Sequence, residues 1–125
     1  MKKPLIVLSL LLIAFGLVAC GGGGGEGGGQ ADQVAAGAEV FEAECVECHT
    51  AGGIGPELNA ATLSAYGNAQ ALYDYTSANM PLDAPGSLSE QQYWDVTAHV
   101  LQEAGQLPAD VVLGPDTASG VTISQ

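Results

Sequence analysis

The chain has 125 residues, enough for one small domain. Its formal net charge is −12, because fourteen acidic residues are balanced by only two basic ones, Lys2 and Lys3. Contacts with phosphate groups need cations, so this composition excludes nucleic acid as a partner and excludes electrostatic attraction to anionic lipid. Any charged protein partner is expected to present a basic face.

Residues 1–19 have the layout of a secretory signal peptide. Lys2 and Lys3 precede an apolar run from Leu5 to Phe15, which is too short to be read as a membrane-spanning helix. The following Leu17-Val18-Ala19-Cys20 resembles a bacterial lipobox. The resemblance implies a lipoprotein signal peptide, cleavage before Cys20 and lipidation of its sulfur. An ordinary signal peptide with an incidental cysteine is the alternative.

The lipobox predicts where the mature protein resides. Cleavage removes both lysines, so no Lys or Arg remains and only the acyl chains on Cys20 can hold the protein at a membrane. We therefore expect an extracytoplasmic, membrane-anchored lipoprotein, in the periplasm or at the outer face of the cytoplasmic membrane.

Residues 20–33 are predicted to form a flexible linker behind the lipidated cysteine. The stretch from Gly21 to Gly29 holds eight glycines and Glu26, and it cannot bury apolar surface. A domain is expected at residues 34–106. Residues 107–125 are small and polar, with Gly and Pro interruptions, and are predicted to be a C-terminal tail.

The first two helices of the domain are predicted from spacing and from caps. Asp32 is a plausible N-cap for a helix whose apolar and small residues recur at helical spacing as far as Cys45. A second helix is expected from Asn68 to Asn79, and Pro81 stops it.

The last helix has the clearest ends. Ser89 with Gln92 three residues later is a capping-box pattern, and Gly105 is a natural stop. No segment alternates with period two for long enough to indicate a sheet. The fold class is therefore predicted to be all-α.

The motif that carries chemistry is Cys45-Val46-Glu47-Cys48-His49. Cys-x-x-Cys-His is the attachment signature of c-type haem, in which two thiols on one helical turn reach the porphyrin vinyl groups and His49 points at the iron. A redox-active cysteine pair is one rival, but it normally begins a helix after a strand. A zinc site is another, but it needs a fourth protein ligand. We predict one covalent haem c on Cys45 and Cys48.

The second axial ligand is predicted by elimination. The chain has two methionines and Met1 is the initiator, which leaves Met80. Its thioether favours ferrous iron and raises the potential. The competitor is His99, the only histidine besides His49. It lies inside the last helix beside Val96, where a packing or surface role is favoured.

The stretch from Ala35 to Gly105 resembles a class I cytochrome c domain, a small helical fold wrapped around one covalent haem. Gly37 and Phe41 match the family's first-helix glycine and aromatic residue. Gly55-Pro56 resembles the loop after the haem motif, and the resemblance implies that the Pro56 carbonyl orients His49. Met80-Pro81 is similar to the family's methionine loop.

Two departures from the family pattern stand out. His99 occupies a position where the family often has an aromatic residue, which makes the contact between the first and last helices less certain. The second departure is the lack of Arg or Lys for the haem propionates. Trp94, Tyr66, Asn59 or backbone N–H groups are expected to serve instead.

Ligation by His49 and Met80 leaves no open coordination position, so we expect an electron carrier and not an enzyme. The predicted function is a membrane-tethered cytochrome c that shuttles single electrons in a respiratory or photosynthetic chain, with redox partners that present a basic docking face. The alternative is a fixed monohaem subunit of a membrane redox complex, such as alternative complex III. A haem peroxidase or ligand sensor is a third, less favoured possibility.

Overall fold

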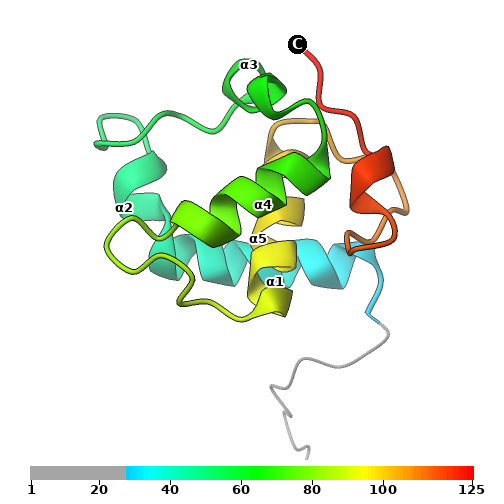
Figure 1. Cartoon of the computed structure of the whole chain (residues 1–125), viewed down its shortest axis with the longest axis horizontal. Helices are drawn as coiled ribbons and strands as arrows, with labels where there is room; N and C mark the ends of the chain where they lie inside the picture. Colours follow the sequence, from blue (N-terminus) through cyan, green and yellow to red (C-terminus); the bar gives the residue numbers. More distant parts are fainter. Residues whose placement is uncertain (1–27) are drawn as a thin grey trace, which may run out of the picture.

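The computed structural model of the chain describes residues 28–125 (Figure 1). The predicted signal peptide, Cys20 and most of the predicted linker lie outside these residues. Within residues 28–125 no β-strand forms, and the only β-type pairing is an isolated antiparallel bridge between Asn68 and Thr122. The predicted all-α class is therefore confirmed.

The described helices follow one another as α1 (Gln30–Glu44), α2 (Val46–His49), α3 (Ala60–Leu63), the 3₁₀ turn η1 (Ser64–Tyr66), α4 (Ala69–Asn79), α5 (Glu90–Glu103) and the 3₁₀ turn η2 (Ala118–Gly120). The side chain of Asn68 caps α4, and Ser89 and Gln92 form the predicted capping box of α5. Gly105 follows α5 with φ +68°, as expected of a helix stop. No helix within residues 28–125 is long and apolar enough to cross a membrane.

Helix α1 starts earlier than predicted. Its N-cap is Gly29, so the expected cap, Asp32, lies inside the first turn. There the Asp32 carboxylate accepts a hydrogen bond from the Gly29 backbone N–H at 3.2 Å. An acidic residue stabilises a helix equally well in this position, because it satisfies a free N–H and faces the positive end of the dipole. The assignment of Asp32 as N-cap was wrong by this shift of three residues.

The centre of the fold is the crossing of α1 and α5, which lie against each other in Figure 1. Gly37 is buried in α1, and a Cβ at this position would overlap the backbone carbonyl of Asp95 and lie 2.8 Å from the His99 Cβ. The rings of Phe41 and His99 pack beside this point, with centroids 5.3 Å apart. The contact between the two helices is therefore made, with His99 in the place of an aromatic residue.

The C-terminal segment, residues 107–125, packs against the helices (Figure 1, orange to red). The buried Gln33 side chain donates to the Leu113 carbonyl at 2.9 Å and accepts from the Leu113 N–H at 2.8 Å. Near the other end of the segment, the Ala69 N–H donates to the Val121 carbonyl at 2.9 Å. This part of the chain was predicted only as a tail, and the structure shows that it supplies part of the core.

One apolar cluster joins α3, α4, α5 and the C-terminal segment. Its buried members are Leu63, Ala69, Leu72, Trp94, Val96, Ala98, Val100, Leu101, Leu113, Ala118, Val121 and Ile123. Four of these twelve residues come from the C-terminal segment, so the small helical domain gains about a third of its buried apolar residues from it.

Replacing Gly37 with Ala should destabilise the protein by at least the upper end of the range of about 1–3 kcal/mol that overpacking costs, because the new methyl group meets backbone and not a movable side chain. Gly120→Ala is the matched control, since a Cβ there would meet nothing within 4 Å. Denaturant unfolding of the haem-loaded protein measures both changes. Equal stability of the two variants would contradict the crossing described above.

Candidate functional site

The Cys-x-x-Cys-His motif occupies a break between two helices. Cys45 has φ −123° and ψ −34°, which ends α1 and lets α2 restart in a new direction. The N–H groups of Cys48 and His49 then donate to the Cys45 carbonyl at 3.2 and 3.0 Å. The two cysteines therefore lie on one helical turn, as the motif predicted.

The loop after the motif folds tightly back onto it. The Gly55 N–H donates to the Cys48 carbonyl at 2.8 Å, and a Cβ at Gly53 would overlap that same carbonyl. This close approach brings the Pro56 carbonyl oxygen to 2.8 Å from the His49 Nδ1. Because a carbonyl can only accept, Nδ1 carries the proton and Nε2 keeps its lone pair for a metal.

The Cys45 thiol lacks the lowered pKa that is typical of a redox-active cysteine pair. Cys45 and Cys48 are half-buried and form no disulfide with each other. Burial, and then the nearby charges of Glu44 and Cys48, raise the pKa of the Cys45 thiol to about 11. A redox-active cysteine pair needs the opposite, a thiol whose pKa is lowered so that the thiolate forms near neutral pH.

A zinc site is also disfavoured. Residues 28–125 contain no group of three or more His, Cys, Asp or Glu side chains that could together hold a metal ion. Haem iron makes a smaller demand, because the porphyrin supplies four nitrogens and the protein supplies only the axial ligands.

Met80 lies directly after the last residue of α4. Its backbone N–H closes the helix by donating to Thr76 at 2.9 Å, and its carbonyl accepts from the Tyr93 hydroxyl at 2.7 Å. Pro81, which is buried, follows. The role of Tyr93 was not predicted, since nothing in a helical Tyr-Trp pair indicates which loop the hydroxyl reaches.

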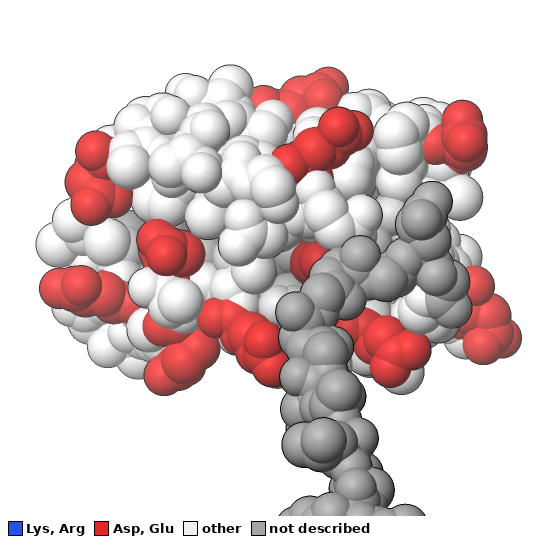
Figure 2. Space-filling model, turned by 90° about the horizontal axis from the view of Figure 1, so that it is seen from below, with Lys and Arg blue, Asp and Glu red and all other residues white. Residues whose placement is uncertain are grey.

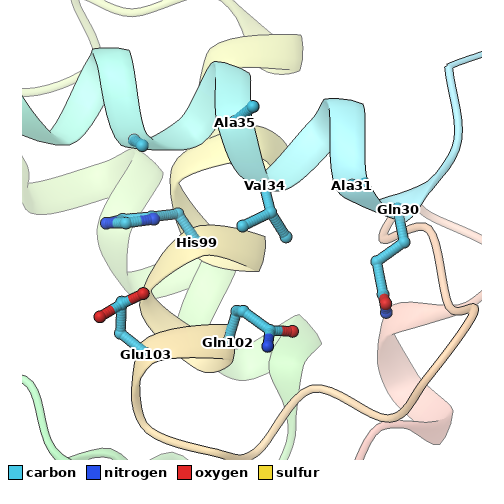
Figure 3. A pocket seen from close by; sticks show the side chains of 8 residues that line it. Gln30, Ala31, Val34, Ala35, His99, Gln102 and Glu103 are labelled. Atoms are coloured by element: carbon cyan, nitrogen blue, oxygen red, sulfur yellow. The ribbon is translucent and has the colours of Figure 1, made fainter.

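His99 and His49 border the same small cavity. This cavity, of about 210 Å³, is lined by Phe41, His49, Leu58, His99, Val100 and Glu103. His99 also lines a second groove between α1 and α5, which Figure 3 shows together with Val34 and Glu103. The His99 Nδ1 is buried and has no hydrogen-bond partner within residues 28–125. His99 therefore packs at the helix crossing, as favoured from the sequence, and it borders the same cavity as His49.

The side chains expected near the propionates differ in whether their polar groups already have hydrogen-bond partners within residues 28–125. Asn59 caps α3, so its side-chain oxygen is already bonded to the Thr62 N–H at 3.1 Å. Tyr66 packs against Tyr75. Trp94 stacks on Tyr73 with centroids 3.6 Å apart, and its buried Nε1 has no hydrogen-bond partner in the described part of the chain.

The donor set described above fits a c-type haem. Two thiols that are not bonded to each other share one turn, and the Nδ1 of the imidazole beside them is bonded to a backbone carbonyl, which leaves Nε2 for a metal. A buried indole N–H also lacks an acceptor within residues 28–125, as expected where a bound group would provide one.

The comparisons with known proteins agree with this reading. The family model described as "Cytochrome C oxidase, cbb3-type, subunit III" matches residues 32–100, more than half of the chain. No curated protein and no solved structure matches. Cytochrome c domains of this family bind haem c covalently, transfer electrons, are typically not enzymes and lie outside the cytoplasm. The chain belongs to this family, and its helical domain is a c-type cytochrome domain consistent with the class I monohaem type.

Proposed function

We propose that Cys45 and Cys48 hold a single haem c through thioether bonds, and that His49 and Met80 are its axial ligands. The observation that carries this proposal is the turn formed by Cys45 and α2, which brings the two thiols together beside a His49 that is oriented by the Pro56 carbonyl at 2.8 Å. When bound, the haem supplies a centre that accepts and releases one electron. A thioether opposite an imidazole favours the reduced state, which suits a carrier.

This ligand pair also supports a carrier over an enzyme. With one ligand from α2 and one from the end of α4, the protein fills both axial positions, and no position is left for oxygen or peroxide. The surrounding side chains offer little acid or base chemistry, since the small cavity beside His49 contains only His99 and Glu103 as further titratable groups.

The protein is proposed to work as a lipoprotein anchored through Cys20. The lipobox sequence supports this, and the glycine-rich residues 20–29 provide a tether between the anchor and α1. Such a tether would let the domain move between an electron donor and an acceptor in one membrane, in a respiratory or photosynthetic chain outside the cytoplasm.

Two surface properties indicate how partners dock. Figure 2 shows acidic side chains spread over one face, and residues 28–125 contain no Lys or Arg, which supports partners with a basic docking face. Ile54 and Leu82, which follow His49 and Met80 by five and two residues, are 85% and 67% exposed. Apolar side chains so close to the proposed ligands provide a contact that can form and separate quickly, while the charges steer the approach.

A fixed subunit of a membrane redox complex is the second candidate. The family description, which names an oxidase subunit, favours it. An assembly of the alternative complex III kind would use the same anchor and haem. Extraction of native membranes with mild detergent separates the two, because a fixed subunit co-purifies in constant proportion with its partners and a shuttle does not.

The covalent attachment is tested by replacing Cys45 and Cys48 with Ser. Wild-type protein should keep haem-linked peroxidase staining on a denaturing gel, and the double variant should lose it, because thioether bonds survive unfolding and axial bonds do not. Ser64→Ala, outside the motif, serves as the control. Loss of the stain from wild type would contradict the proposal.

The ligand pair is tested by comparing Met80→Ala with His99→Ala. The first change should lower the reduction potential and allow cyanide or carbon monoxide to bind, because it opens one axial position. The second should do neither, and its effect should be confined to stability. If the His99 change alone altered the iron spectrum, a bis-histidine centre would replace the His–Met pair.

The anchor is tested by replacing Cys20 with Ser. This variant should appear in the soluble fraction with its haem attached, because it cannot receive acyl chains. Wild type with two or more chains should resist salt washing and need detergent for release. Release of wild type by salt alone would show that protein contacts, and not lipid, hold it at the membrane.

A further inference from the structure

One buried hydroxyl holds both ends of the loop that follows Met80. Tyr93 lies in the first turn of α5 and is 3% exposed. Its hydroxyl donates to the Met80 carbonyl at 2.7 Å and accepts from the Leu88 N–H at 3.4 Å. Met80 and Leu88 flank the segment 81–87, which we call the methionine loop.

The methionine loop has few other ties to the helical body. Its remaining described hydrogen bonds are local, with Ala84 N–H to Pro81 at 3.0 Å, Ser87 N–H to Ala84 at 3.2 Å and Gly86 N–H to Met80 at 3.4 Å. Residues 82–87 are all exposed. Pro81 is buried at the start of the loop, and the bonds of Tyr93 are the hydrogen bonds that join the two ends of the loop to α5.

The Tyr93 ring is itself held in place. It meets Tyr73 of α4 edge to face, with centroids 6.4 Å apart and an interplanar angle of 87°. Tyr73 in turn stacks on Trp94, with an interplanar angle of 11°. Because aromatic packing from two helices fixes the ring, the position of its hydroxyl does not depend on the bond to the Met80 carbonyl.

We propose that Tyr93 is a positioning residue for Met80, and that its hydroxyl limits how readily the methionine leaves the iron. This inference rests on the proposed ligation by Met80. When the sulfur leaves the iron together with its loop, the backbone at residue 80 moves, and that movement breaks the hydrogen bond from Tyr93. Without the hydroxyl, the carbonyl keeps only the longer bond from Gly86, so the open form costs less.

The test is Tyr93→Phe in the full-length, haem-loaded protein, with imidazole as the probe that competes for the sixth position. Imidazole should bind roughly fivefold more tightly than to wild type, the effect of one net hydrogen bond on the population of the open form. The spectral signature of sulfur–iron ligation should remain in the absence of imidazole, because Met80 itself is unchanged.

Tyr73→Phe is the matched control. It removes a hydroxyl from the same aromatic cluster, but that hydroxyl makes no hydrogen bond within residues 28–125. It should bind imidazole as wild type does. Hydrogen exchange gives a second readout that does not use the iron: the Gly86 and Leu88 amides should exchange faster in Tyr93→Phe, and the Ala98 amide in the middle of α5 should not.

The results distinguish a failure of the proposed Met80 ligation from a failure of the proposed role of Tyr93. Wild-type protein without a sulfur–iron signature would overturn the ligation by Met80, and this inference with it. A normal signature with equal imidazole binding in Tyr93→Phe and Tyr73→Phe would overturn the role of Tyr93 alone. Faster exchange throughout α5 would also overturn it, since that pattern indicates general loosening and not positioning of one loop.

Discussion

The close crossing of α1 and α5 at Gly37 is the constraint on which the proposed site depends. Because no side chain separates the two helices there, the backbone of α1 lies against Asp95, and the direction of each helix fixes that of the other. Cys45 and α2 follow directly after the C-terminal end of α1. Tyr93, in the N-terminal turn of α5, donates a hydrogen bond to the carbonyl of Met80. This helix contact thus places the turn that holds His49 and the Tyr93 hydroxyl that binds the Met80 carbonyl.

The C-terminal segment explains how so small a domain builds a core. The family match ends at residue 100, and the segment that follows α5 contributes buried residues to the main cluster. Small domains bury a low share of their surface, so an added segment matters more than in a large protein. Gln33 fixes where the segment packs, because the N–H and the C=O of its side-chain amide both bond to the Leu113 backbone. These groups are buried, so leaving either of them without a partner would be costly.

The sequence was sufficient for most features whose cause is local. The helix that starts after Asn68, the capping box at Ser89, the stop at Gly105 and the helical turn of the Cys-x-x-Cys-His motif all depend on residues within a few positions of each other. The start of α1 was missed because Asp32 stabilises a helix either as cap or inside the first turn. The packing of residues 107–125 and the bond from Tyr93 could not be predicted, since each joins parts of the chain that only the tertiary fold brings together, without periodicity in the sequence to indicate it.

Because the described domain lacks Lys and Arg, neutral polar groups make most of its internal contacts and the carboxylates determine its surface charge. Most of the polar contacts described above are made by amides, hydroxyls and backbone groups, such as Gln33 with Leu113 and Tyr93 with Met80, and no ion pair with Lys or Arg is possible within residues 28–125. Such neutral contacts do not depend on ionic strength. The carboxylates of residues 28–125 are exposed, apart from that of Asp95, whose pKa is raised by burial. Their field is therefore directed outward, and it can attract a basic partner without weakening the contacts that hold the proposed iron ligands.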